Sequence, residues 1–244
     1  MKGGDYSVDS LAIKDQAYTL RMKAAERLAM AERETGFGAF ASSRVLAVTS
    51  GKGGVGKTNL VINLSIALAG LGNRVFVMDA DLGLANVDVL LGLAPKYNLR
   101  HVVKGEKHLA EIIIKGPGGI SVIPGGSGGD GLLSFSREER EVLVNLIPTL
   151  EREADVLIVD TGAGLSRGVV DFLVASDEVI VVTTPEPTAL TDAYATIKVV
   201  FQENPAGRVG VIVNMVSSAR HAAEVADKLS MVTGRFLEKK VNFI

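Results

Sequence analysis

The sequence of 244 residues contains no cysteine and no tryptophan, and its charges are almost balanced. Without cysteine the chain cannot form disulfides, thiolate zinc sites or cysteine-ligated iron–sulfur clusters, and it has no cysteine nucleophile. Its 26 lysines and arginines stand against 28 aspartates and glutamates, so no excess of positive charge argues for nucleic acid as a partner. No apolar run approaches the ~18 residues of a membrane-spanning helix, and the N-terminus lacks the apolar core of a secretory signal. These absences predict a soluble, cytoplasmic protein.

The first part of the chain differs in composition from the rest. Residues 10–34 are rich in Ala, Leu, Arg, Lys and Glu, which favour helix, and small apolar residues recur on one face of that helix. The glycine-rich residues 35–43 then predict a linker. We therefore expect an N-terminal amphipathic helix and linker over residues 1–43, followed by a domain over residues 44–244.

From residue 44 onward, apolar runs typical of strands alternate with helical stretches. Near-continuous Val, Ile and Leu runs are typical of strands covered on both faces, which predicts an α/β fold with a doubly wound, mostly parallel sheet. The expected strands span residues 45–50, 74–79, 120–124, 155–160, 178–183 and 208–214, and the expected helices span 58–71, 136–154, 188–203 and 218–239. Residues 241–244 resemble the start of another strand, so we expect the chain to be truncated at its C-terminus.

A phosphate-binding loop follows the first of these strands. Residues 51–58 read GKGGVGKT, which fits G-x-x-x-x-G-K-[ST] between a strand and a helix. Glycines let backbone N–H groups turn toward phosphate oxygens, and the N-terminus of the next helix adds a favourable field. We expect Lys57 to bind the β- and γ-phosphates as a catalytic group and the Thr58 hydroxyl to ligate Mg²⁺. The other expected nucleotide contacts are Gly51, Lys52, Gly53, Gly54, Val55, Gly56 and Asn59.

Lys52 is a second lysine in this loop, and a cradle for one nucleotide does not need it. With it the loop resembles the KGGxGKT loop of the deviant Walker A family of MinD, ParA and their relatives, and the resemblance covers most of residues 44–244. The resemblance implies a MinD-like P-loop NTPase fold and a slow, Mg²⁺-dependent ATPase that forms a homodimer around ATP. In that dimer Lys52 would reach across to the phosphates bound by the second subunit and act in catalysis.

Aspartates lie at the predicted carboxyl ends of two strands, the edge of a parallel sheet where ligand chemistry collects. Asp79, Asp81 and Asp160 should therefore lie near the phosphate loop. Residues 79–92 resemble the switch I segment of the family, which implies that Asp81 positions the hydrolytic water and that Asp79 supports it at the metal. We expect Asp88 to be a helix cap or a surface residue.

The strand over 155–160 ends in DTGAG, where an aspartate follows four apolar residues in the Walker B pattern. We expect Asp160 to hold Mg²⁺ through water, and the glycines to let the loop approach the γ-phosphate and move on hydrolysis. The segment resembles switch II, but MinD relatives carry proline where Gly162 stands. The DTGAG form resembles instead the FlhG (FleN, YlxH) branch of the family, which regulates flagella.

The base is expected to be adenine. The N/T-K-x-D pattern that reads guanine is missing, and Asn214 at a strand end matches the adenine-contacting asparagine of the family. Its side-chain amide can pair with the edge of adenine, although a turn-forming role stays open. Residues 185–198 also resemble the family, and we expect them to close the site, with Thr188 as a helix cap.

The N-terminal helix carries a second motif of the same branch. Residues 15–21 read DQAYTLR and resemble the D-Q-A-x-x-L-R motif of FlhG, whose helix docks on FlhF, a GTPase of the signal-recognition-particle type, and stimulates it. A glutamine supplied in trans can orient an attacking water. The resemblance implies that Gln16 activates the partner and that Asp15, Leu20 and Arg21 help to bind it. A helix that packs on its own domain or swaps between subunits is the alternative.

The resemblance implies an ATP-dependent dimerisation switch that regulates flagellar number and placement, with FlhF, C-ring components and the membrane as partners. In the family a C-terminal amphipathic helix binds membrane reversibly in the ATP dimer, and this chain ends before any such helix. Two alternatives remain. The first is a binding module in which the core only carries the helix over 10–34. The second is a division or ParA-like partitioning ATPase; residues 218–240 have only a modest basic surplus, so no specific nucleic acid is expected.

Overall fold

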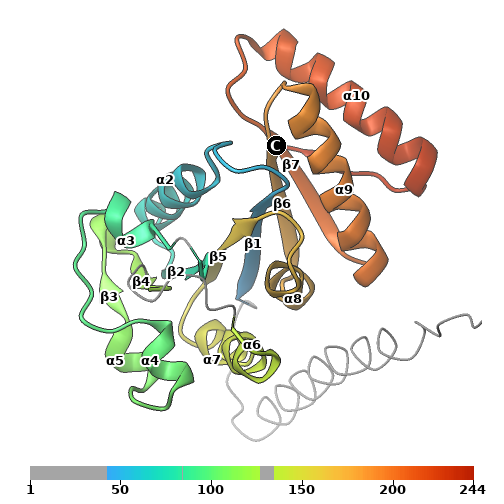
Figure 1. Ribbon diagram of the computed structural model, residues 1–244. Coiled ribbons are helices and arrows are strands. Elements are labelled where there is room, and N and C mark those ends of the chain that lie inside the picture. Colours follow the sequence, from blue (N-terminus) through green and yellow to red (C-terminus); the bar gives the residue numbers. More distant parts are fainter. Residues whose placement is uncertain (1–42, 84, 127–134) are drawn as a thin grey trace, which may run out of the picture. The chain divides into compact units, whose positions relative to one another are not determined.

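The computed structural model describes residues 43–83, 85–126 and 135–244 (Figure 1). The predicted N-terminal helix over 10–34 and the linker over 35–43 lie outside the described residues except for Ser43. An eight-stranded sheet has the order β3-β4-β2-β5-β1-β6-β7-β8. All of its strand pairs are parallel except that of the short edge strand β3 with β4, which confirms the predicted doubly wound, mostly parallel α/β fold.

The predicted strands are all present, with small shifts at their ends. Their bounds are β1 Arg44–Ser50, β2 Val75–Ala80, β3 Ile114–Lys115, β4 Ser121–Ile123, β5 Val156–Ala163, β6 Glu178–Thr183, β7 Arg208–Val213 and β8 Asn242–Phe243. The central strand β1 lies between β5 and β6, and Val48 of β1 is paired with Asp160 of β5. This register brings Asp160, in the second half of β5, beside the strand that leads into the phosphate loop.

Helices cover both faces of the sheet (Figure 1). The helix α2, Lys57–Gly70, packs on one face, where Val61 and Ile62 meet apolar side chains of β1, β2, β4, β5 and β6. The other face is covered by α7 (Ile147–Glu151), α8 (Arg167–Ala175) and α9 (Pro187–Glu203). The remaining helices are α3 Val87–Leu90, α4 Leu99–Val103, α5 Leu109–Ile112, η1 Pro117–Gly119, α6 Arg137–Val144 and α10 Ala219–Leu237.

Three local predictions were wrong. The helix expected over 136–154 is divided into α6 and α7, because Pro148 has no N–H to donate to the carbonyl of Val144. The cap of α9 is Glu186 rather than Thr188, because Pro187 occupies the first helical position and Thr188 lies inside the helix. Asp88 is neither a cap nor a surface residue: Asn86 caps α3, and Asp88 is buried in the first turn.

Candidate active site

The phosphate loop connects the carboxyl end of β1 to the N-terminus of α2, as expected. Gly56 caps α2 with φ 89°, a left-handed conformation that glycine adopts without strain. A Cβ atom at Gly56 would overlap the side-chain amide of Asn214, and one at Gly51 would lie 2.5 Å from backbone atoms of Asp192 in α9. The loop therefore runs between the end of β7 and the start of α9, and glycine is required at both ends of it.

Lys57 and Asp160 form a buried ion pair at the base of this loop. The ammonium of Lys57 donates to Oδ1 of Asp160, and the lysine is only 8% exposed while the aspartate is fully buried. The second carboxylate oxygen of Asp160, Oδ2, is buried and accepts no hydrogen bond from the described residues. A buried anionic oxygen without a donor has lost its hydration without replacement, which makes it a good ligand for a cation.

Charged and polar groups surround the carboxylate of Asp160. Burial raises the pKa of Asp160, while the Lys57 ammonium and the nearby Thr58 hydroxyl oppose that rise and the charge of Asp81 adds to it. Thr58 thus lies beside the carboxylate with which it was predicted to share Mg²⁺. Within the described residues no three His, Asp or Glu side chains converge on one point. A hydroxyl and one carboxylate fit Mg²⁺, which keeps several waters and takes its other ligands from substrate phosphates.

Asp79 is placed differently from its predicted role at the metal. Its Oδ2 accepts the backbone N–H groups of Asn86 and Val87, both at 3.0 Å, and its Oδ1 accepts that of Asp81 at 3.2 Å. Burial is the main cause that raises the pKa of Asp79 to about 7, and the nearby charge of Asp160 adds to the rise. The three backbone N–H donors act in the opposite direction and lower the pKa. With both oxygens engaged, the carboxylate organises the backbone of the switch I loop, from its first residue to the start of α3.

Asp81, the residue predicted to position water, faces the switch II loop. A Cβ atom added at Gly162 would lie 3.4 Å from Oδ1 of Asp81, so the carboxylate lies directly against this glycine. Asp81 is partly exposed and close enough to raise the pKa of Asp160 by its charge. The structure therefore brings Lys57, Thr58, Asp81 and Asp160 to one place.

Lys52 is held by α9 rather than by the phosphate loop. Its Nζ lies 2.5 Å from Oε2 of Glu186 and 3.4 Å from Oγ1 of Thr188. The side chains of this ion pair are 42% and 63% exposed, so the lysine remains at the surface. The sequence analysis did not identify Glu186; the only available signal was its position between two prolines at a strand-to-helix junction.

Asn214 makes both of its side-chain hydrogen bonds within the protein. Its amide nitrogen donates to the carbonyl of Val55 in the phosphate loop at 2.9 Å, and its Oδ1 accepts the N–H of Met215 at 2.9 Å. Met215 is exposed and has φ 56°, which is uncommon for a residue other than glycine. The amide predicted to contact adenine therefore ties the phosphate loop to the turn after β7, and adenine recognition by Asn214 stays a prediction.

The predicted partner-binding residues Asp15, Gln16, Leu20 and Arg21 lie outside the described residues.

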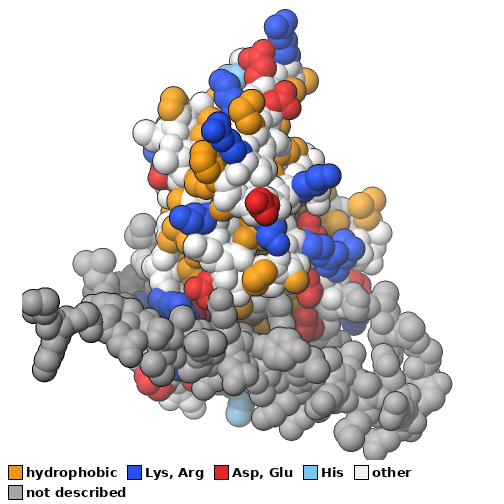
Figure 2. All heavy atoms as spheres, turned by 90° about the vertical axis from the view of Figure 1, so that its right-hand side faces the viewer, with side chains coloured by type: hydrophobic (Ala, Val, Ile, Leu, Met, Phe, Trp, Pro, Cys, Tyr) orange, Lys and Arg blue, Asp and Glu red, His pale blue; other side chains and the backbone are white. Residues whose placement is uncertain are grey.

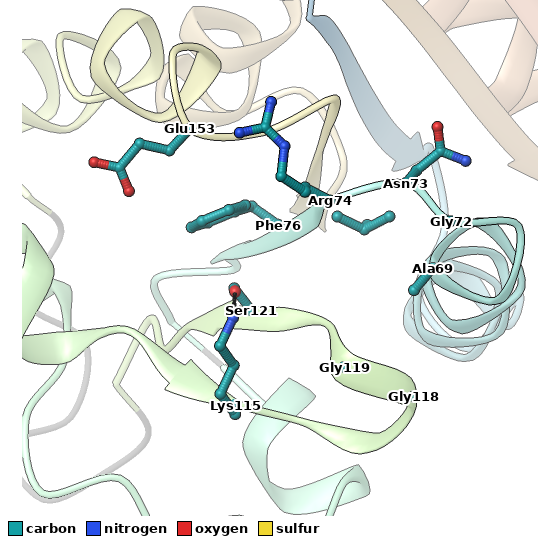
Figure 3. A pocket seen from close by; sticks show the side chains of 11 residues that line it. Ala69, Gly72, Asn73, Arg74, Phe76, Lys115, Gly118, Gly119, Ser121 and Glu153 are labelled. Carbon is teal, nitrogen blue, oxygen red and sulfur yellow. Dashed lines mark hydrogen bonds between the residues drawn. The ribbon is translucent and has the colours of Figure 1, made fainter.

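A separate cavity of about 400 Å³ lies at the other end of the sheet (Figure 3). Residues at the start of β2 and β4 line it, among them Phe76 and Ser121, and Lys115 donates to Ser121 across 2.8 Å. The phosphate loop follows the carboxyl end of β1, so this cavity belongs to a different edge of the molecule.

The face over α9 and α10 carries mixed side chains. Figure 2 shows Lys and Arg there among Asp, Glu and hydrophobic side chains, rather than gathered together. Arg220 at the start of α10 is paired with Glu224 at 3.1 Å. This surface gives little support to the DNA-binding alternative, which needs a continuous basic patch.

Comparisons with known proteins indicate the family of the chain. A family model described as an AAA domain matches residues 43–205. The chain is 44% identical over 201 residues to the antiactivator FleN of Pseudomonas aeruginosa, with 82% of this chain and 72% of FleN covered. It is 41% identical over 192 residues to the flagellum site-determining protein YlxH of Helicobacter pylori, covering 78% of this chain and 64% of YlxH.

Among solved structures, the septum site-determining protein MinD of Pyrococcus horikoshii in complex with Mg-ADP is similar, with a TM-score of 0.64 and 27% identity. The similar region covers 76% of each chain. The chain spans less than two thirds of the length of YlxH, so these likenesses concern the P-loop domain and not the whole of each relative.

Proposed function

The chain belongs to the MinD/ParA-type ATPase family, close to FleN and YlxH, and on that premise we propose that it is an ATP-driven dimerisation switch that regulates the number or placement of flagella. The observation that carries this proposal is Lys52, a second lysine at the phosphate loop whose side chain points to the surface and not to its own Lys57–Asp160 pair. A lysine in that position could exchange its surface ion pair with Glu186 for the phosphates bound by a second copy of the chain.

ATP hydrolysis follows from the groups that the structure brings together. Lys57 would leave Asp160 to bind the β- and γ-phosphates, and Thr58 and Asp160 are the residues that would hold Mg²⁺, whose charge would offset that of the phosphates. Asp81 orients the attacking water, and the backbone around Gly162 follows the γ-phosphate and relaxes when it is lost. Turnover is slow, because a switch needs a long-lived ATP state.

The dimerisation proposal is tested with Asp81→Ala in the presence of saturating Mg-ATP. Because this variant keeps Lys52, Lys57 and Asp160, it should bind ATP, fail to hydrolyse it and remain dimeric in light scattering. The matched control is Asp155→Ala, which removes an exposed aspartate at the opposite end of β5 and should hydrolyse ATP as the unchanged chain does. A monomeric Asp81→Ala protein at saturating Mg-ATP would overturn the switch.

We further propose that the N-terminal segment stimulates an FlhF-type GTPase through Gln16. The support is the DQAYTLR motif together with the similarity to FleN and YlxH. The test is the GTPase rate of the cognate FlhF with the unchanged chain, with residues 1–35 deleted, and with Gln16→Ala. Stimulation by the unchanged chain alone supports the proposal. Equal rates with all three would instead leave an ATPase whose N-terminal segment has another role.

The partners of the ATP state are proposed from the same family. We propose that the protein is cytoplasmic, that its full-length, ATP-bound form attaches reversibly to the membrane, and that it contacts C-ring components of the flagellum. Among the described residues no helix is long and apolar enough to cross a bilayer. Co-sedimentation of the full-length protein with anionic vesicles, with ATP and with ADP, tests the attachment, and equal binding with both nucleotides would contradict a switch.

A further inference from the structure

Arg100 connects α4 to the switch I loop that carries Asp81. Its Nη2 donates to the backbone carbonyl of Leu82 at 3.3 Å, and its guanidinium carbon lies 5.1 Å from the centre of the Phe135 ring. Leu82 directly follows Asp81, so the guanidinium restrains the peptide next to the carboxylate proposed to orient water. A guanidinium over an aromatic face is attracted to it and keeps its N–H groups free for hydrogen bonds in the plane.

The N-terminus of α4, which carries Arg100, is anchored to the rest of the domain. Leu99 at the start of α4 is fully buried, and its N–H donates to the carbonyl of Pro124 at 2.9 Å. The Asn98 side chain caps α4 by accepting the N–H of Arg100 at 3.0 Å. Phe135 is only 8% exposed and belongs to the apolar core on this face of the sheet. The backbone of Arg100 and the ring beneath its guanidinium are therefore both held by well-packed parts of the domain.

The switch I loop is held from two sides. Asp79 binds the N–H groups of Asp81, Asn86 and Val87. Arg100 binds the carbonyl of Leu82, a group of opposite polarity in the same loop. Removing Arg100 takes away one restraint on the peptide after Asp81, while the hydrogen bonds of Asp79 and the packing of Leu82 against the apolar core remain.

We propose that Arg100 is a positioning residue for ATP hydrolysis: it fixes the Asp81–Leu82 segment so that the Asp81 carboxylate stays against Gly162. The proposal rests on the ATPase activity proposed above. Because Arg100 contacts the switch loop and not the phosphate loop, it should govern turnover and leave nucleotide affinity unchanged. A misplacement of about 1 Å at a catalytic group is enough to lower turnover by one to two orders of magnitude.

The experiment compares Arg100→Met, Arg100→Lys and the control Arg137→Met. Arg137 lies on α6 and is paired with the exposed Glu141, so the control removes the same kind of side chain away from the switch loop. Three quantities are measured for each protein: the affinity for a fluorescent ATP analogue, kcat with KM for ATP, and hydrogen exchange of the amides over residues 81–87 without nucleotide.

We expect Arg100→Met to lose about tenfold in kcat with unchanged analogue affinity and faster exchange over residues 81–87. Arg100→Lys keeps a cation and one donor, so it should fall between Arg100→Met and the unchanged chain, while Arg137→Met should match the unchanged chain. Unchanged kcat and exchange in Arg100→Met, or equal losses of affinity and kcat, would overturn the proposal. If the unchanged chain itself neither binds nor hydrolyses ATP, the proposed function fails, and unchanged exchange in Arg100→Met would then overturn the positioning role separately.

Discussion

The ammonium of Lys57 donates a hydrogen bond to the carboxylate of Asp160, and both side chains are buried. The two residues neutralise each other at the place where phosphate and Mg²⁺ are expected. A buried pair of this kind contributes little net stability, but loss of one partner leaves the other charge without compensation. Binding of Mg-ATP would exchange the pair for two new ones, lysine with phosphate and aspartate with the cation.

The first prediction concerns Lys57→Met, which removes the charge and keeps most of the volume. The variant should lose ATP binding, and its free energy of unfolding without nucleotide should fall by about 3 kcal/mol because Asp160 stays buried and unpaired. Isothermal titration with Mg-ATP and urea unfolding measure the two effects. Micromolar ATP affinity in this variant would contradict the assignment of the phosphate loop.

The double variant Lys57→Met/Asp160→Asn separates stability from binding. Since it removes both charges, it should recover most of the lost unfolding free energy and still fail to bind ATP. A double variant as unstable as Lys57→Met would show that packing around Lys57, and not the unpaired carboxylate, causes the loss.

The second prediction concerns Lys52→Ala. The variant should bind ATP with nearly the affinity of the unchanged chain and stay monomeric in light scattering, because it loses the proposed contact across the dimer and keeps Lys57. Its stability should change by less than about 1 kcal/mol, since the ion pair with Glu186 is exposed. The control is Lys104→Ala, an exposed lysine after α4. A stable ATP dimer of Lys52→Ala would rule out the cross-subunit role.

The third prediction concerns pH and the ion pair of Asp155 with Arg74, which joins the amino ends of β5 and β2. The Arg74 side chain, at 2.7 Å, and then the Arg74 backbone N–H hold the pKa of Asp155 below its ordinary value. A depressed carboxyl pKa means that this stabilisation is fully present above the unfolded-state value of about 3.9 and is lost as pH falls through the lower folded-state value.

The pair is tested by carboxyl-carbon NMR titration of Asp155. In Arg74→Met the pKa of Asp155 should rise toward its ordinary value without reaching it, because the backbone N–H of residue 74 still donates. Arg137→Met, which removes an exposed arginine on α6, should leave the titration of Asp155 where it is. The same pKa in Arg74→Met and in the unchanged chain would show that the side chain is not the main cause.

The parts of the fold with a local sequence signal were predicted from the sequence. The Val- and Ile-rich runs predicted every long strand, since such runs are buried on both faces wherever they occur in a parallel sheet. The single helix predicted over 136–154 was wrong because the pattern of charged and apolar residues continues across Pro148, whereas the helical backbone hydrogen bonds do not. The short helices α3, α4 and α5 were missed, because four or five residues are too few to establish a helical period.

The candidate site was predictable where a motif and a strand end coincide. Lys57, Thr58, Asp81 and Asp160 converge because the carboxyl ends of neighbouring parallel strands meet. The side-chain orientations of Asp79 and Asn214 could not be predicted, because each is decided by which backbone groups lie nearby. Arg100 and Glu186 carry no motif of their own, and their contacts with Leu82 and Lys52 join segments far apart in the sequence.

The last prediction separates two roles of Asn214. If the amide mainly ties the phosphate loop to the turn after β7, Asn214→Ala should weaken binding of ATP and of inorganic tripolyphosphate alike, since Val55 and Met215 both lose their partner. If it mainly reads adenine, only ATP binding should weaken. The two internal bonds favour equal losses, with a fall of about 1–2 kcal/mol in stability. Asn63→Ala, which removes an exposed amide from α2, should change neither affinity. If Asn214→Ala fully retained its affinity for tripolyphosphate, Asn214 would not be needed to tie the phosphate loop to the turn after β7. Contact with adenine would then be the role that remains for it.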